Sequence, residues 1–218
     1  MANCFLICLI LMNKKKEYIH FGLSCLGFKS RQDVYENLYL KAIIDSYGRI
    51  EKSIDLENNI RDRFVWDFEN TNQITCRLVN DGILQIDLER YHFISQNEKK
   101  RTDLTFFISG LGNFTFECKR LFKKNSKNEA YIADGLKRFI DSQYSRMNDY
   151  AGMLGFVVSG DITTIRAELL NKCRNVSYIP NDFTSQEYDE WKHTIKTAHS
   201  RNGNTNICIY HLFFEFNK

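Results

Sequence analysis

Two strand-like runs on either side of a glycine-rich turn constrain the fold of this 218-residue chain more than any other feature of its sequence. The first run begins at Asp103 and continues as LTFFI, and the second, FTFECKRL, begins at Phe114. The segment between them, 109–113, reads SGLGN, a composition typical of tight turns. We therefore predict a β-hairpin that turns near Leu111.

The second strand of this hairpin is expected to have two chemically different faces, because successive side chains of a strand point to opposite sides of the sheet. Phe116 and Cys118 share one side, whereas Glu117 and Lys119 share the other. The hairpin brings Asp103, at the start of the first strand, close to this polar pair. Two carboxylates and an ammonium group are thus expected to converge on one small area.

Helical and strand-like periodicities alternate along the rest of the chain. An Asp-Gly dipeptide at 81–82, between apolar runs, predicts a further hairpin and makes 74–79 (ITCRLV) an edge strand. Asp55 and Asp161 precede helical patterns and are expected to cap them. A polar stretch follows 173. The predicted elements are helices at 31–48, 55–68, 129–147 and 161–173, and strands at 74–79, 83–93, 103–108, 114–121, within 150–161 and at 207–216.

Length and composition favour one α/β domain that covers 1–218, with a core at about 50–161 and additions at both ends. Hydrophobic residues make up 43% and charged residues 26%, which is ordinary for a globular protein. The net charge of +3 is too small to indicate nucleic-acid binding, so any basic patch must be local. Seven cysteines without a repeated spacing predict reduced thiols and a cytoplasmic protein, rather than disulfides or a zinc site.

An apolar run, 4–12 (CFLICLILM), lies near the start of the chain and is followed by three lysines at 14–16. Nine residues are too few to span a bilayer as a helix. A signal peptide would carry its positive charge before the apolar run rather than after it. We predict that the run packs as a buried strand or helix and that the protein has no membrane partner. A membrane-associating segment and a misassigned start site are the alternatives.

At Asp103 and at Glu117-Cys118-Lys119 the chain resembles the PD-(D/E)xK nuclease superfamily. The pattern of that family is an acid at a strand start, followed by acid-x-Lys on the next strand. The resemblance implies a restriction-endonuclease-like core with a mixed central sheet flanked by helices (αβββαβ). The predicted order of helix, three strands, helix and strand over 55–161 agrees with it. Thr102 stands where the name of the motif has proline, a departure that the family tolerates.

The resemblance also implies roles for these residues. Asp103 and Glu117 would bind Mg²⁺, with Mn²⁺ as a substitute, because carboxylate oxygens suit hard cations. Lys119 would orient or help deprotonate the attacking water, or stabilise developing negative charge. The family often adds a glutamate from the first helix, and Glu57 is the residue carried over as a catalytic and metal-binding acid. Its competitors are Glu51 and Glu36.

Cations that follow the motif are expected to approach the phosphates of a nucleic acid. Arg120, Lys137 and Arg138 would make contacts of this kind beside the metal, independently of base sequence. His199 and Arg201, before the last strand, form a candidate second phosphate-facing pair. For any single cation, a solvated charged surface is the alternative.

These patterns predict a Mg²⁺-dependent endonuclease that hydrolyses phosphodiester bonds, in DNA rather than RNA because DNA is the commoner substrate of the family. Small stand-alone domains of this type often resemble effector subunits of bacterial antiviral defence systems, and a restriction-type or repair nuclease is equally compatible. The sequence has no zinc-finger, helix-turn-helix or P-loop motif, so specificity or activation would come from a protein partner. The alternative is a catalytically inactive scaffold with this fold that binds a protein or a nucleic acid.

Overall fold

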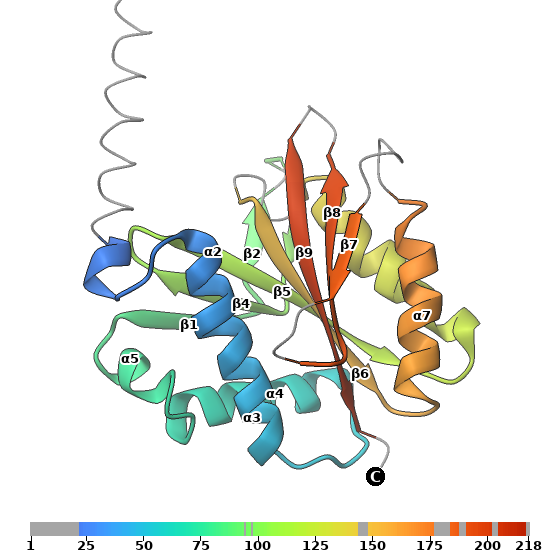
Figure 1. Ribbon diagram of the computed structural model, residues 1–218, viewed down its shortest axis with the longest axis horizontal. Coiled ribbons are helices and arrows are strands. Elements are labelled where there is room, and N and C mark those ends of the chain that lie inside the picture. The colour runs from blue at the N-terminus through green and yellow to red at the C-terminus, as the bar shows by residue number, and fades with distance from the viewer. Residues whose placement is uncertain are drawn as a thin grey trace, which may run out of the picture.

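The computed structural model describes residues 22–93, 95–96, 98–143, 148–176, 184–187, 191–201 and 205–216. Within them a seven-stranded mixed sheet is flanked by helices (Figure 1), so the expected α/β class is confirmed. The apolar run at 4–12 lies outside the described residues. In the part of the chain that is described, no helix is long and apolar enough to cross a membrane.

The sheet combines antiparallel and parallel pairs. Three neighbouring strands in its middle, β5, β6 and β9, run parallel, and all other neighbours are antiparallel. Across the sheet the order is β1 (Leu84–Leu88), β4 (Leu104–Ile108), β5 (Gly112–Leu121), β6 (Tyr150–Val157), β9 (Asn206–Glu215), β8 (Thr194–Ser200) and β7 (Thr184–Glu187).

Helices cover both faces of the sheet. One face packs on a continuous helical segment, 31–49, and on α4, whereas the other packs on the segment 129–140 and on α7. The helices are α2 (Arg31–Val34), the π-helix η1 (Tyr35–Leu40), α3 (Lys41–Arg49), α4 (Glu57–Asn70), α5 (Cys76–Asn80), the short 3₁₀ helix η2 (Asn125–Asn128), the π-helix η3 (Tyr131–Leu136), α6 (Lys137–Ile140) and α7 (Ile162–Cys173).

The β4–β5 hairpin forms as predicted. Leu104 pairs with Phe116 at one end and Ile108 with Gly112 at the other, so the chain turns at 109–111. Phe116 and Cys118 join the core under α4, while Glu117 faces away from it, which confirms the two-faced strand. With α5, β2, β3 and η2 set aside, the order α4, β1, β4, β5, η3–α6, β6 follows the predicted helix, three strands, helix and strand. The single strand predicted at 83–93 is wrong, because it is divided between β1 and β2, which lie in different sheets. A separate two-stranded ribbon, β2 (Tyr91–Phe93) and β3 (Lys99–Arg101), is inserted between β1 and β4.

The predicted edge strand at 74–79 and its Asp81-Gly82 hairpin are wrong, because residues 76–79 lie in the helix α5. Asn72 is fully buried, and its Oδ1 accepts hydrogen bonds from the backbone N–H groups of Ile74 and Thr75. Such a side-chain cap offers the backbone a helical turn instead of a strand partner. Gly82, at φ +69°, then joins α5 to β1.

The predicted helix caps are half right. Asp161 caps α7 by accepting a hydrogen bond from the Thr164 N–H at 2.7 Å. Asp55 does not cap α4, because the helix begins one residue later than expected and Leu56 occupies the N-cap position. The Asp55 carboxylate instead accepts hydrogen bonds from the Leu56 N–H and the Asn59 side chain.

Two further expectations need correction in the C-terminal half. The helix predicted over 129–147 ends at Ile140, because Ser142 adopts φ +59° and the chain turns back, with the Gln143 N–H donating to the Arg138 carbonyl. The polar stretch after 173 contains two strands, β7 and β8, which extend the sheet beyond β9.

A glycine on β6 makes room for the aromatic core beside the candidate motif, which gives a test of the fold. A Cβ atom at Gly152 would lie 2.1 Å from the Phe116 ring, which is fully buried against Phe106 and Phe114. Gly152→Ala should therefore lower the free energy of unfolding by about 1–3 kcal/mol, as overpacking does. The measurement is the midpoint of urea unfolding.

Gly48→Ala is the matched control. Gly48 lies inside α3, and a Cβ atom added there would have no other atom within 4 Å. The same substitution there should raise the free energy of unfolding by up to about 1 kcal/mol, because alanine favours the helix. Equal effects of the two substitutions would contradict the packing described for Gly152.

Candidate active site

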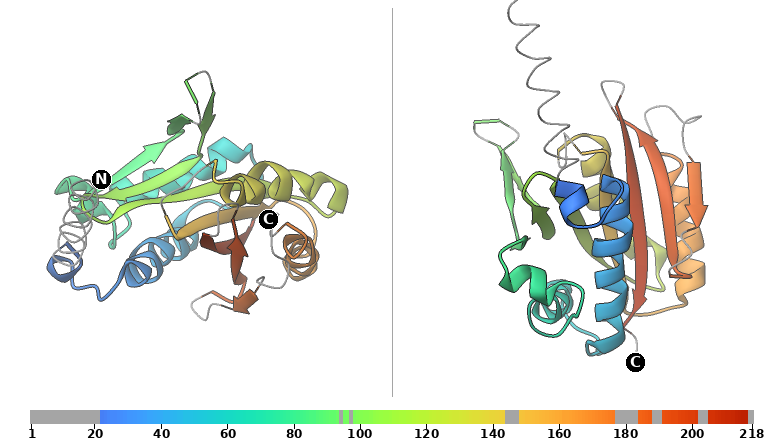
Figure 2. Two further views of the ribbon diagram at one scale, coloured as in Figure 1. Left: turned by 90° about the horizontal axis from the view of Figure 1, so that it is seen from above. Right: turned by 60° about the vertical axis from the view of Figure 1, so that its left-hand side comes forward.

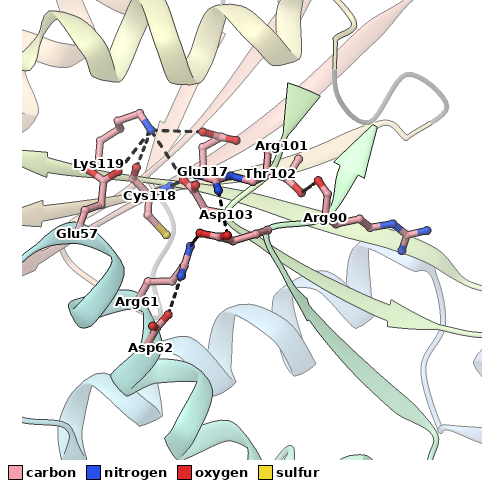
Figure 3. Close-up of polar contacts among 11 residues, drawn as sticks. Glu57, Arg61, Asp62, Arg90, Arg101, Thr102, Asp103, Glu117, Cys118 and Lys119 are labelled. Carbon is pink, nitrogen blue, oxygen red and sulfur yellow. Dashed lines mark hydrogen bonds and ion pairs between the residues drawn. The ribbon is translucent and has the colours of Figure 1, made fainter. Parts of the chain in front are cut away.

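Four of the predicted residues meet at one place on the sheet. Lys119 Nζ lies 3.4 Å from Glu117 Oε2, 3.7 Å from Glu57 Oε1 and 3.8 Å from Asp103 Oδ2. Figure 3 shows the three acidic side chains gathered around this ammonium group. Asp103 directly precedes β4, Glu117 and Lys119 lie two apart on β5, and Glu57 is the first residue of α4.

The backbone of β5 holds the two flanking acids in position. Its partner β4 begins only at Leu104, opposite Phe116, so the later amides of β5 on that side extend beyond the strand pairing. Asp103 Oδ2 accepts a hydrogen bond from the Cys118 N–H at 2.7 Å. Glu57 Oε2 accepts one from the Arg120 N–H at 2.8 Å. Both carboxylates are therefore fixed by main-chain donors and not only by contact with Lys119.

Glu117 is the most enclosed of the acids. Its side chain is 1% exposed, and Oε1 has no hydrogen-bond partner. Oε2 faces Lys119 and also Arg138, whose Nη1 lies 3.7 Å away. Burial and the neighbouring Asp103 charge raise the pKa of Glu117 to about 8, although Lys119 and Arg138 oppose the shift. The fold thus holds a carboxyl group that is partly protonated at neutral pH.

Lys119 is kept charged by its neighbours. Burial alone would lower its pKa, but Asp103, Glu117 and Glu57 outweigh that effect and raise it. Three carboxyl groups face two cations, Lys119 and Arg138, so the site is short of positive charge. The pKa of Glu117 is raised mainly by burial and then by the Asp103 charge, whereas the pKa of Lys119 is raised by the surrounding carboxylates against the effect of burial.

The donor set fits a hard divalent cation only in part. Asp103 and Glu117 supply oxygen ligands, and the partnerless Glu117 Oε1 is an atom that a cation would satisfy. Mg²⁺ commonly takes only one or two protein carboxylates. Among the described residues, however, no three His, Cys, Asp or Glu side chains form a group that could hold a metal ion. The three carboxylates here point at the Lys119 ammonium rather than at a common point of their own.

Of the three candidates for an acid supplied by the first core helix, the structure brings Glu57 beside Lys119. Glu57 is at the site. Glu36 instead accepts a hydrogen bond from the Tyr210 hydroxyl at 2.6 Å and lies 3.4 Å from Lys196 on β8. Glu51 is exposed in the loop before α4, where its carbonyl accepts a long hydrogen bond from Arg63.

Sequence reasoning missed Arg61, which lies beneath the acidic cluster (Figure 3). It is 4% exposed, donates from Nε and Nη2 to Asp62, and places Nη1 3.5 Å from Glu89. Burial lowers its pKa, but Asp62 and also Asp103 outweigh this effect and raise it. The available signal was its spacing of four from Glu57, which puts both residues on one side of a helix.

The expected phosphate-binding cations separate into a group near the acids, Arg120, Lys137 and Arg138, and a distant pair, His199 and Arg201. Arg138 lies at the site through its contact with Glu117, and Arg120 contributes its backbone N–H to Glu57 while its guanidinium donates to the Asp55 carbonyl at 3.4 Å. Lys137 is exposed beside Arg138 on α6.

His199 and Arg201 do not belong to the site, which corrects their prediction as a phosphate-facing pair. They are 1% and 3% exposed, and β6 and β9 lie between β5 and β8. His199 Nε2 lies 2.8 Å from Thr197 Oγ1, and burial lowers its pKa to about 4. A neutral imidazole enclosed in the sheet cannot meet a phosphate.

Comparisons of the chain with protein-family models, with curated proteins and with solved structures found no match.

The raised pKa of Glu117 predicts a specific pH dependence of stability. An acid with a folded-state pKa of about 8 and an unfolded value of about 4.3 stabilises the fold fully below pH 4.3, and this contribution is lost as pH rises through 8. Glu117→Gln is neutral at every pH. Its free energy of unfolding should therefore rise relative to that of the wild type as the pH increases from 4.3 to 8. The gain should reach the order of a few kcal/mol. Urea unfolding of both proteins from pH 4 to 9, with chelator, measures it. A difference that does not change with pH would contradict the shift.

Proposed function

We propose that the protein is a metal-dependent endonuclease that hydrolyses phosphodiester bonds, with DNA as its favoured substrate. The observation that carries the proposal is the convergence of Asp103, Glu117 and Glu57 on Lys119, with one Glu117 oxygen buried and unpartnered. A carboxylate in such a setting is costly unless a cation or proton satisfies it. The order of elements around it, and the acid and acid-x-Lys positions on neighbouring strands, support a restriction-endonuclease-like core.

Asp103 and Glu117 would hold Mg²⁺, or Mn²⁺ in its place, with Glu57 as a third acid at the side. When bound, the ion polarises a phosphoryl oxygen, acidifies a water molecule and offsets negative charge in the transition state. Glu117 would give up its proton on binding, because a ligating carboxyl must be ionised. The main-chain N–H of Cys118 keeps Asp103 oriented throughout.

Lys119 would act mainly as a fixed positive charge. Its raised pKa favours the ammonium form, which orients the attacking water or stabilises charge on the phosphorane better than it abstracts a proton. Its hydrogen bond to the Cys118 carbonyl at 2.8 Å fixes its direction. Arg138, whose Nη1 lies 3.7 Å from the same Glu117 oxygen that faces Lys119, adds a second cation for a phosphate oxygen.

Binding of the substrate would rest on cations around the acids. Arg120, Lys137 and Arg138 would contact phosphates without reading bases, and a protein partner would supply specificity or activation. The resemblance is compatible with an effector of a bacterial antiviral defence system and equally with a restriction-type or repair nuclease. The five described cysteines are free, which suits the reducing cytoplasm. They are Cys25, Cys76, Cys118, Cys173 and Cys208.

Replacing either metal-binding acid should abolish cleavage and leave binding. Asp103→Ala and Glu117→Ala remove groups that act through the metal, whereas phosphate contacts in the ground state remain. Lys119→Ala should lower the cleavage rate by about 10²- to 10³-fold, as loss of a transition-state charge does. The measurements are cleavage of plasmid and single-stranded DNA with Mg²⁺, and binding with Ca²⁺ or chelator.

Glu51→Ala is the matched control, since it removes an exposed acid near the start of the same helix and should leave the rate unchanged within about twofold. Undiminished cleavage by Asp103→Ala or Glu117→Ala, or activity that is indifferent to chelator, would show that these acids are not the active site. Binding without any cleavage by the wild type would favour the inactive scaffold.

A further inference from the structure

A small ribbon stands apart from the main sheet immediately before the candidate active site. Its strands β2 and β3 pair only with each other among the described strands, and Figure 2 shows them rising clear of the seven-stranded sheet. Thr102 follows the ribbon and Asp103 comes next. The ribbon is therefore the segment of chain that directly precedes Asp103.

One face of the ribbon alternates aromatic rings with cations. Tyr91 pairs with Arg101 and Phe93 with Lys99, so all four side chains lie on the same face. The rings are 53% and 76% exposed. Lys99 Nζ lies 4.2 Å from the centre of the Tyr91 ring and forms no ion pair with a described residue. We call these four residues the aromatic face.

The base of the ribbon is anchored to the site. The Thr102 N–H donates to the Arg90 carbonyl at 2.9 Å, and the Glu89 N–H donates to the Asp103 carbonyl at 3.2 Å. These bonds fix the direction in which the ribbon leaves the chain segment that carries Asp103.

Ion pairs tie the aromatic face to the helix that carries Glu57. Arg101 donates to Glu89 at 3.0 Å, and the other oxygen of Glu89 lies 3.5 Å from Arg61 Nη1. Arg61 is one turn after Glu57 on α4. Arg101 is also only two residues from Asp103, a separation of at most about 7 Å along the chain. A ligand on this face would thus reach the carboxylates.

We propose that the aromatic face binds an unpaired stretch of polynucleotide and presents it to the carboxylates, so that the substrate of this nuclease contains single-stranded nucleic acid. Bases stack on Tyr91 and Phe93, and Lys99 and Arg101 contact the adjoining phosphates. The inference rests on the proposed nuclease function and defines its substrate class. A base inside a duplex cannot offer its flat surface to a side chain, so paired DNA gains only the charge contacts.

The charge pattern favours a polynucleotide over a protein partner on this face. Apolar rings alone would suit a hydrophobic protein interface, but such interfaces are depleted of lysine at their centres. Here a cation stands opposite each ring, which matches a ligand that alternates flat apolar groups with anions. Single-stranded nucleic acid has that chemistry, whether its sugar is deoxyribose or ribose.

The test measures binding of labelled 20-nucleotide single strands, as DNA and as RNA, and of the corresponding DNA duplex, with Ca²⁺ in place of Mg²⁺. Tyr91→Ala and Phe93→Ala should each weaken single-strand binding by about 5- to 150-fold, whereas Tyr91→Phe retains the ring and should bind like wild type. Duplex binding should change far less. Lys99→Gln should reduce the salt dependence of single-strand binding by about 0.7 in slope.

Trp66→Ala is the control for loss of an exposed aromatic, because Trp66 is 61% exposed on α4 and outside the ribbon. Unchanged single-strand binding by both alanine variants, or equal losses for single strand and duplex, would overturn the proposal. The proposal would also be overturned if sedimentation showed that Tyr91→Ala or Phe93→Ala changes the oligomeric state, because the face would then be a protein interface.

Cleavage assays of the same proteins in Mg²⁺, beside these binding measurements in Ca²⁺, separate the two proposals. Wild type that cleaves in Mg²⁺, beside ribbon variants that bind like it, would refute the aromatic face and leave the nuclease. Wild type that never cleaves, beside ribbon variants that lose single-strand binding, would refute the nuclease and support the aromatic face as a binding surface.

Discussion

The candidate site depends on β4 being shorter than β5. Because β4 begins only at Leu104, the amides of Cys118 and Arg120 reach beyond the strand pairing and need acceptors. Asp103 and Glu57 provide them from two different directions, the start of β4 and the start of α4. A longer β4 would satisfy those amides with carbonyl oxygens and leave the two acids without fixed positions. The polar cluster is thus a consequence of where β4 begins.

A shortage of positive charge follows from that arrangement. Main-chain donors hold the two outer acids in place, and the pleat of β5 turns Glu117 inward beside them. The cations within reach, Lys119 and Arg138, approach Glu117 at 3.4 and 3.7 Å but leave one of its oxygens without a partner. In an enclosed site this deficit of positive charge has a large electrostatic effect, because a low dielectric constant screens the interactions between charges only weakly. The same field that attracts protons would attract a divalent cation.

The parts of the fold that could be predicted are those set by neighbours in sequence. The parity of Glu117 and Lys119 and the turn near Leu111 follow from local rules, and both hold. The burial of His199 could not be foreseen, since it depends on β8 pairing with β9, and TIKTAHS alone reads as polar. The helix α5 likewise could not be predicted, because it depends on a hydrogen bond from the Ile74 N–H to the buried side chain of Asn72. The pattern of apolar residues in ITCRLV does not reveal such a cap.

The sequence separations within the site set the order in which it can assemble. Asp103 and the Cys118 amide are 15 residues apart, within one hairpin, whereas Glu57 and the Arg120 amide are 63 apart. Short loops close faster than long ones, so the hairpin can bring its acid and lysine together while α4 is still undocked. The third acid arrives only when the helix packs on the sheet. A newly synthesised chain would accordingly carry an incomplete set of acids until its tertiary structure is finished.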